Sequence, residues 1–251
     1  MKFDDLDRQM RVYEQSLDQI LDRNIYMVAR LDGRSFTRLT KEVCDFEAPF
    51  DVRFRDMMTE TVKALMDCGF RVVYGFTESD EISLLFHPDE EAFGRKVRKY
   101  NSILAGTASA AFSAKLGRIG VFDCRMVPLP NLECVKDYFL WRQEDANRNA
   151  LNSHCYWAMR KDGATVEEAT GALEGKSTEY KINLLTSFGI DFETLPTWQK
   201  NGIGLYQAEL QKEGYNPLTQ ERTVTTRKKI HTEYNLPRGE AYGEMIEGLL
   251  R

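Results

Sequence analysis

The chain has 251 residues, of which 42% are hydrophobic and 29% charged, a balance typical of a globular protein with a full hydrophobic core. The formal net charge of −5 argues against a protein whose whole surface grips nucleic acid, but it allows an enzyme with a local basic patch. Because no apolar run reaches the roughly 18 residues of a membrane helix and the acidic first residues are unlike a signal peptide, we expect a cytoplasmic protein with no membrane partner.

The first half of the chain alternates between helical and strand-like patterns. Hydrophobic spacing predicts a helix over 6–21, and the β-branched run over 25–31 predicts a short strand. A second helix is expected over 50–68. Two strands follow, over 71–76 and 81–86, and the polar four-residue link between them has the length of a hairpin turn.

The pattern then continues with a long helix from Pro88 to Lys115 and a strand over 122–127. A helix is expected over 132–161, ending before Gly163. The remainder is less regular, with short helices over 165–173 and 178–187 and short strands over 202–206 and 223–234.

The order of elements indicates the fold class. A strand, a helix, a hairpin, a helix and a strand form a split βαβ unit, in which helices pack on one face of a ferredoxin-like sheet. We therefore expect an α+β fold, with a palm-like catalytic domain over 1–135 and a smaller C-terminal appendage of helices and strands over 136–251.

Acidic residues stand where two of the predicted strands begin or end. Asp32 follows the first strand and precedes Gly33, whereas Asp80 and Glu81 stand where the hairpin enters its second strand. Two aspartates from neighbouring strands suit Mg²⁺, which takes few carboxylates and leaves its other positions to water and phosphate oxygens. Asp-Gly and Ser-Asp-Glu are also common turn compositions, so spacing alone leaves a metal site and plain turns both open.

Three further segments are candidates for binding phosphate. The loop after the first strand offers backbone N–H groups and hydroxyls to a triphosphate, the long helix carries a basic cluster, and a second basic run lies near the C-terminus, where it can contact RNA phosphates. Each segment also fits an ordinary loop or a solvated face. The candidates are Gly33, Arg34, Ser35, Phe36 and Thr37; Lys96 and Lys99; and Arg227, Lys228 and Lys229.

Several ordered blocks of this sequence resemble those of the tRNA-His guanylyltransferase family. The resemblance runs from about Ile25 to Trp157 and continues weakly through Lys181. Its main blocks are Arg30-Leu-Asp-Gly-Arg-Ser-Phe36, Pro49-Phe-Asp51, Tyr74-Gly-Phe-Thr-Glu-Ser-Asp-Glu-Ile-Ser83 and Trp141-Arg-Gln143. Several blocks in the right order are far more specific than any one of them.

The resemblance implies a catalytic domain like the palm of polymerases and nucleotide cyclases, with two Mg²⁺ ions as cofactors. The ions are expected on the side chains of Asp32 and Asp80 and on the carbonyl of Gly33, with Glu81 as a further catalytic carboxylate.

The resemblance also implies substrates and partners, namely ATP and GTP as nucleotide substrates, tRNA as acceptor, and assembly as a homotetramer. Asp51, Ser79, Lys96 and Lys99 match positions that handle the nucleotide or its triphosphate, and Lys181 matches a lysine that engages tRNA.

One block departs from the family pattern. Where eukaryotic members read His-Ile-Asn-Asn-Leu-Tyr-Asn, this chain reads Asn147-Arg-Asn-Ala-Leu-Asn-Ser153, in a block tied to the choice of tRNA-His. We therefore expect the guanylyltransferase-like branch, which extends incomplete tRNA 5′ ends in the 3′-to-5′ direction. The alternatives are a strict tRNA-His guanylyltransferase, a nucleotide cyclase, and a non-catalytic RNA-binding protein on a degenerate palm.

Overall fold

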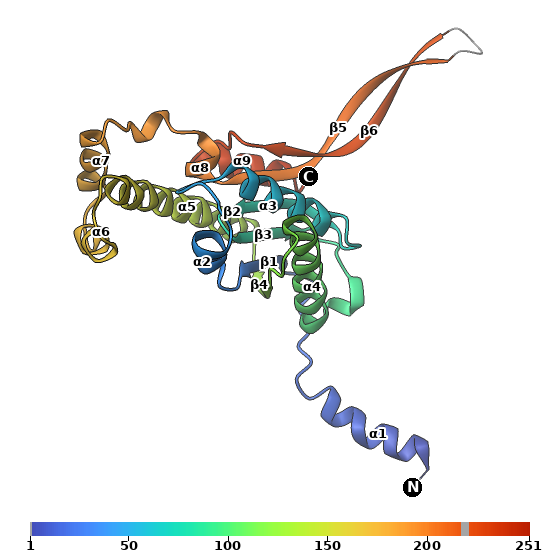
Figure 1. Ribbon diagram of the computed structural model, residues 1–251. Helices are drawn as coiled ribbons and strands as arrows, with labels where there is room; N and C mark the ends of the chain where they lie inside the picture. Colours follow the sequence, from blue (N-terminus) through green and yellow to red (C-terminus); the bar gives the residue numbers. More distant parts are fainter. Residues whose placement is uncertain (1, 217–220) are drawn as a thin grey trace.

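A computed structural model of the chain describes residues 2–216 and 221–251. Its centre is an antiparallel sheet with strand order β4-β1-β3-β2-β5-β6 (Figure 1). The first four strands in this order are the split βαβ unit expected from the sequence. The strands are β1 Tyr26–Gly33, β2 Val72–Glu78, β3 Glu81–Phe86, β4 Phe122–Leu129, β5 Ile203–Asn216 and β6 Glu221–Glu233.

Helices and helical turns occupy most of the remaining chain. The helices predicted over 132–161 and 178–187 match α5 and α7 at both ends. The helices are α1 Phe3–Glu14, α2 Phe36–Arg38, α3 Val52–Met66, α4 Val97–Leu116, α5 Leu132–Lys161, α6 Val166–Leu173, α7 Thr178–Ser187, α8 Thr197–Asn201 and α9 Glu240–Gly248. A π-helical turn spans Leu39–Val43, and 3-10 turns span Ala92–Arg95 and Phe192–Thr194.

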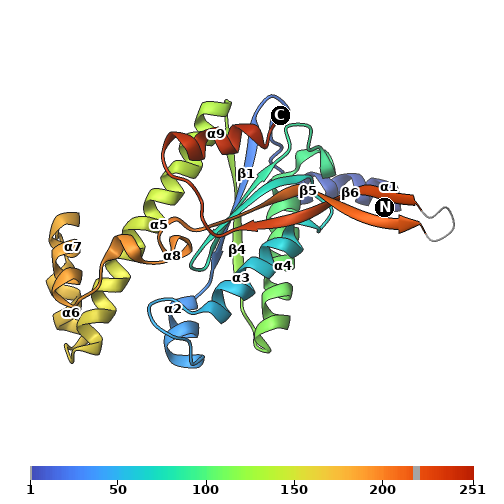
Figure 2. The same ribbon diagram turned by 90° about the horizontal axis from the view of Figure 1, so that it is seen from above.

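The sheet is covered on both faces (Figure 2). As predicted, α3 and α4 pack on one face, where Met27 and Leu31 of β1 enter the main core. The opposite face is covered too, because β1 also carries the fully buried Val28, which packs with Phe139 of α5 and Tyr242 of α9. A strand that is apolar on both faces needs a layer on each. The palm-like fold is confirmed, with α5 and α9 as its second layer.

The strand β4 extends further than the sequence indicated. It continues beyond Val127 through Pro128, which lies opposite Met27 of β1. Proline is tolerated there because β4 is at the edge of the sheet, where one side of the strand needs no hydrogen-bond donor.

The C-terminal third adds to this sheet. β5 pairs with β2, with Thr77 opposite Ile203, and β5 and β6 form a hairpin that projects well beyond the other strands (Figure 1). The division of the chain near residue 135 stays a prediction.

The N-terminal helix α1 projects away from the rest of the chain (Figure 1). It ends at Glu14 rather than near residue 21, and none of its residues is buried. The helix is amphipathic as expected, but none of the described residues buries its apolar face. Within the described residues, no helix combines the length and the apolar composition that crossing a bilayer requires.

Candidate active site

A row of carboxylates crosses three adjacent strands at one end of the sheet. Asp32 of β1 lies opposite Glu81 of β3, and Glu81 lies opposite Glu78 at the end of β2. Residues directly opposite one another in an antiparallel sheet point to the same face, so all three point toward α5. Sequence reasoning missed Glu78, although it continues the alternate positions of Tyr74 and Phe76, which face α5.

Asp80 joins this row from the hairpin turn. β2 and β3 extend so far that only Ser79 and Asp80 remain between them, and Ser79 adopts a positive φ of 47°. The Gly33 N–H donates to the carbonyl of Asp80 at 3.1 Å. A Cβ on Gly33 would lie 2.9 Å from the Cβ of Asp80 and 2.5 Å from the ring of Phe36. Glycine is therefore required for the end of β1 to approach the turn.

Three of these carboxylates, those of Asp32, Glu78 and Asp80, are grouped together without a described basic side chain paired to balance them. Burial, followed by the charge of Asp32, raises the pKa of Asp80. Burial, followed by the charge of Glu81, raises the pKa of Glu78 to about 7. Among the side chains that the structure describes, those of residues 2–209 and 227–251, no basic group forms an ion pair with Asp32, Glu78 or Asp80. Such a cluster is stabilised by protons or by a bound cation.

Glu81 differs, because two arginines hold it. One of its oxygens lies 2.7 Å from Arg30 and the other 2.8 Å from Arg142 of α5, whose side chain is only 2% exposed. The contact with Arg142 is an ion pair outside hydrogen-bond geometry, so Glu81 Oε1 keeps unused hydrogen-bond capacity. Burial raises the pKa of Glu81 even though both arginines lower it. Arg142 also pairs with Asp145 and lies 4.1 Å from the ring centroid of Trp141.

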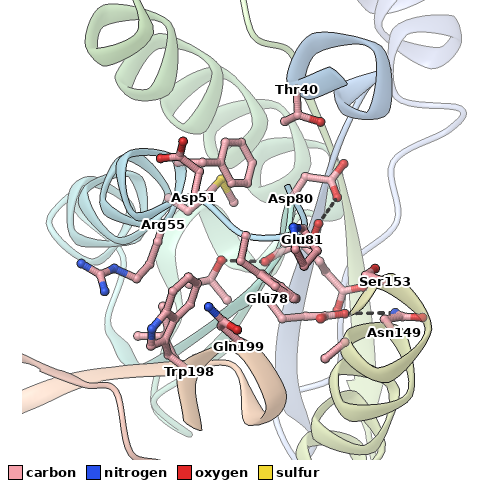
Figure 3. A pocket seen from close by; sticks show the side chains of 18 of the residues that line it. Thr40, Asp51, Arg55, Glu78, Asp80, Glu81, Asn149, Ser153, Trp198 and Gln199 are labelled. Atoms are coloured by element: carbon pink, nitrogen blue, oxygen red, sulfur yellow. Dashed lines mark hydrogen bonds between the residues drawn. The ribbon is translucent and has the colours of Figure 1, made fainter. Parts of the chain in front are cut away.

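The carboxylates open into a cavity of about 450 Å³, which is the size of a small-molecule site (Figure 3). Its walls come from the β2–β3 hairpin, the segment before α3, the middle of α5, and α8. The lining includes Asp32, Thr40, Glu47, Asp51, Arg55, Glu78, Ser79, Asp80, Glu81, Asn149, Ser153, Trp198 and Gln199.

Asp51 has a structural role in the cavity wall. It is the N-cap of α3, and its carboxylate accepts from the N–H groups of Arg53 at 2.6 Å and Glu47 at 2.7 Å. The Arg53 guanidinium lies 2.6 Å away. These hydrogen bonds, led by that of the Arg53 side chain, lower the pKa of Asp51 to about 2.

The loop after β1 is only partly in the site. Phe36 is buried against Phe112 and Phe122, and with Thr37 it lines a second hollow beside the main cavity. Arg34 and Ser35 are exposed and line neither space. Their predicted contact with a triphosphate has no support from this arrangement.

The lysines of the predicted triphosphate clamp lie away from this cavity, so their role stays a prediction. Lys96 immediately precedes α4, where it lies opposite Ile20 and pairs with Asp18 at 3.2 Å. Because β3 leads away from Glu81, α4 starts at the far end of the sheet, and only its C-terminus returns to the carboxylates. At 1.5 Å per residue, its 20 residues put roughly 30 Å between these ends. Lys99, one turn further along α4, lies over the ring of Phe93 instead.

The predicted RNA-binding residues also lie outside the cavity. Lys181 is on α7, which packs against α5. The backbone carbonyl of Lys181 accepts a hydrogen bond from the thiol of Cys155 on α5. Lys228 lies opposite Glu209, six residues along β5 from the cavity residue Ile203, or about 20 Å at the rise of a strand. Arg227, Lys228 and Lys229 are all exposed.

The donors present fit a hard cation, although they are few. Among the described residues, no group of three or more His, Cys, Asp or Glu side chains is arranged around one point. Asp32 and Asp80 nevertheless lie close enough for the charge of Asp32 to raise the pKa of Asp80. Mg²⁺ is commonly held by one or two carboxylates together with substrate phosphates and water. Asp32 and Asp80 are two carboxylates that this end of the sheet offers to such an ion.

Comparisons with known proteins identify the family. A family model described as tRNAHis guanylyltransferase matches residues 7–130, and one described as Thg1 C terminal domain matches residues 133–240. A probable tRNA(His) guanylyltransferase of Dictyostelium discoideum is 31% identical over 230 residues, covering 86% of this chain and 87% of its own. The chain belongs to the tRNA-His guanylyltransferase family. It is therefore a nucleotidyltransferase.

Other members of the tRNA-His guanylyltransferase family agree in sequence and in fold. The tRNA(His) guanylyltransferase of Schizosaccharomyces pombe is 31% identical, covering 77% of each chain. The crystal structure of the Saccharomyces cerevisiae enzyme superposes with a TM-score of 0.70 at 25% identity, covering 77% of this chain and 91% of that one. A bacterial tRNA(HIS) guanylyltransferase (Thg1)-like protein in complex with GTP shares the fold, with a TM-score of 0.74 at 23% identity over 98% of this chain and 99% of its own.

Proposed function

We propose that this chain adds nucleotides to the 5′ end of tRNA in the 3′-to-5′ direction, using the cavity beside Asp32 and Asp80. The observation that carries the proposal is a pair of carboxylates that line a nucleotide-sized cavity and have no ion-pair partner among the described side chains, in a chain of this family. Structures of a bacterial tRNA(HIS) guanylyltransferase (Thg1)-like protein in complex with GTP and with ATP support nucleoside triphosphates as the substrates of this site.

In this proposal the side chains of Asp32 and Asp80 and the carbonyl of Gly33 hold two Mg²⁺ ions. When bound, the ions lower the pKa of the attacking hydroxyl and neutralise charge on the phosphates. The chain itself contributes position. The turn at Ser79 and Asp80 is held against β1 by the hydrogen bond from Gly33, so the carboxylates need no rearrangement before reaction.

The proposed chemistry has two transfers. The tRNA 5′-monophosphate first attacks the α-phosphorus of ATP and releases pyrophosphate. The 3′-hydroxyl of the incoming nucleotide then attacks the activated 5′ phosphorus, forming the new phosphodiester bond and releasing AMP. A tRNA that already carries a 5′-triphosphate skips the first transfer and releases pyrophosphate in the second.

Glu81 acts as a positioning residue in this scheme. Its ion pairs join β3 to Arg142 of α5 and to Arg30 of β1. These contacts hold the helix that forms one wall of the cavity against the strands that carry Asp32 and Asp80.

The choice of tRNA follows from the block that departs from the family pattern. The block lies on α5, where Asn149 donates to Glu78 at 3.4 Å and Asn152 and Ser153 line the cavity. Because this wall differs from that of the eukaryotic enzymes, we expect the protein to repair several incomplete tRNAs rather than to modify tRNA-His alone. Assembly as a homotetramer and a cytoplasmic location also stay predictions.

The test is to incubate the protein with Mg²⁺, the four nucleoside triphosphates and tRNAs lacking their first nucleotide, and to map the 5′ ends of the products. Full-length tRNA-His and a second full-length tRNA serve as matched substrates. The proposal expects the missing paired nucleotide to be restored on more than one tRNA. Addition of a single guanosine to tRNA-His alone would contradict the broad substrate choice, and no 5′ addition to any RNA would contradict the function.

A further inference from the structure

A second hollow of about 330 Å³ lies beside the main cavity and shares a wall with it. The shared residues are Thr40, Pro49, Phe54, Ser79, Asp80, Asn152 and Ser153. The hairpin turn that carries Asp80 therefore borders both spaces. A group seated in the second hollow lies next to the same carboxylate as a nucleotide in the first.

The far wall of this second hollow combines a cation with two aromatic rings. Lys41 Nζ lies 5.4 Å from the ring centroid of Tyr156 and 5.8 Å from that of Trp157. The two rings are half-buried and meet edge to face at 5.4 Å. Aromatic faces beside a basic side chain are the composition with which proteins hold nucleotides of a single strand, by stacking on the base and pairing with the phosphate.

Lys41 is available for such a contact. The adjacent acid Glu42 pairs with Arg38 at 3.5 Å, and no carboxylate of residues 2–209 and 227–251 forms an ion pair with Lys41. Lys41 also lies on the π-helical turn, where the Cys44 N–H donates to the carbonyl of Leu39 at 2.9 Å. Such turns are rare and occur often at functional sites.

We infer that this hollow binds the 5′-terminal nucleotide of the RNA acceptor. The base stacks on the ring of Trp157 and meets Tyr156, which stands edge to face with that ring, at its edge. Lys41 pairs with the terminal phosphate, which then lies beside Asp80. The larger cavity is left for the nucleoside triphosphate, so the two reacting groups meet at the turn. The inference rests on the proposed function, and it explains how a chain with a net charge of −5 holds an RNA end through one local cation.

The experiment measures binding without transfer. An acceptor-stem RNA hairpin labelled at its 3′ end, with either a 5′-phosphate or a 5′-hydroxyl, is titrated with protein in Mg²⁺ and no nucleotide, and anisotropy is recorded. Trp157→Leu should weaken binding of the phosphorylated RNA about 10-fold, as expected for loss of one stacking platform. Lys41→Ala should remove the preference for the phosphorylated end. The Kd for ATP, measured separately, should stay within about two-fold in both variants because ATP occupies the other cavity.

Two further variants guard against trivial effects. Trp157→Phe keeps an aromatic face and should therefore retain most of the RNA affinity. This result would show that Trp157→Leu loses affinity through the missing aromatic ring rather than through misfolding. Lys115→Ala removes the same charge from a lysine that pairs with Glu60 at 3.7 Å, and it should bind as the wild type does.

Wild-type affinity in Lys41→Ala and Trp157→Leu would overturn the inference. A parallel loss of ATP affinity would also overturn it, because the hollow would then belong to the free nucleotide. A third outcome separates the two proposals. If the wild type prefers the phosphorylated end and Lys41→Ala does not, but the wild type transfers no nucleotide, the proposed function fails and the RNA-end site stands.

Discussion

Glu81 shows that neighbouring acids in one motif have different roles. Asp80 is without a positive partner among the described residues, whereas Glu81 is held between Arg30 and Arg142. Its two ion pairs lie in a largely buried setting, with 8% of the Glu81 side chain and 2% of the Arg142 side chain exposed. Removing one partner of a buried ion pair leaves the other charge without compensation, which is strongly destabilising.

We therefore expect Glu81→Gln to lower the free energy of unfolding by about 3 kcal/mol, because Arg30 loses its counter-charge and Arg142 keeps only that of Asp145. Transfer activity should fall as the wall of α5 loosens, while the affinity for Mn²⁺, used as a probe for Mg²⁺, should change little. Urea unfolding and Mn²⁺ titration by electron paramagnetic resonance measure the two quantities. Unchanged stability combined with lost Mn²⁺ binding would make Glu81 a metal ligand instead.

At the scale of elements, the start of α3 depends on Asp51. Its carboxylate caps the helix and also binds Glu47 N–H and the Arg53 guanidinium. Asp51→Ala should lower the free energy of unfolding at neutral pH by about 1–2 kcal/mol, whereas Asp51→Asn, which keeps a capping oxygen, should cost less.

The pH dependence of this effect follows from the low pKa of Asp51, about 2 in the folded chain. A lowered pKa means that the folded state favours the charged carboxylate, so its stabilisation is complete above about pH 4 and is lost as the pH falls toward about 2. The stabilities of the wild type and of Asp51→Ala should therefore converge over that range. A difference that persists at pH 2 would show that the effect arises from packing rather than from charge.

The hairpin of β5 and β6 is the second element with a testable role. Its exposed basic run Arg227, Lys228 and Lys229 lies about 20 Å from the cavity, at 3.3 Å per residue, within the dimensions of a bound tRNA. Replacing all three by alanine should reduce the slope of log K for tRNA against log salt concentration by about 2, because three phosphate contacts are lost.

A matched control for the hairpin variant removes three charges that the chain already neutralises. Arg8, Lys63 and Lys115 pair with Asp5 and Glu60, so their replacement by alanine should leave the slope unchanged. Equal slopes in the hairpin variant and the wild type would exclude the hairpin from tRNA binding.

The sequence predicted the elements where local signals were strong. The helix α5 was placed correctly because 30 residues of helical pattern precede Gly163, which follows its end. The strand β5 was expected to end at residue 206, because the ribbon beyond it carries polar residues such as Glu209 and shows no alternating apolar face. The strand β6, predicted over 223–234, has nearly the expected length.

The candidate site was predictable in part for the same reason. Asp32 and Asp80 stand out because each interrupts an apolar strand, and the structure brings them together. Glu78 was assigned to the turn of the hairpin, whereas it is the last residue of β2 and lies opposite Glu81. Lys96 and Lys99 were placed at the wrong end of the sheet, because the direction of α4 depends on topology and not on nearness in sequence.

At the scale of the whole molecule, the exposed helix α1 provides a test of the predicted homotetramer. The helix has 12 residues, and helices of this length are marginal in water without a partner. It exposes 78% of Phe3 and 69% each of Val12 and Tyr13. Light scattering should give the mass of four chains of 29.0 kDa for the full protein and a lower mass after deletion of residues 2–16. An unchanged mass would remove α1 from the interface.

The central claim is that Asp32 and Asp80 hold the metal for nucleotide transfer to an RNA 5′ end. The most direct measurement compares wild type and Asp80→Asn for the rate of 5′ addition to a tRNA lacking its first nucleotide, together with Mn²⁺ affinity and thermal stability.

We expect the rate to fall by at least about 100-fold and Mn²⁺ binding to weaken, because one of two carboxylate ligands is lost. The melting temperature should be equal or higher, because a desolvated charge beside Asp32 is removed. An Asp80→Asn protein that binds Mn²⁺ normally and transfers nucleotides at the wild-type rate would contradict the account.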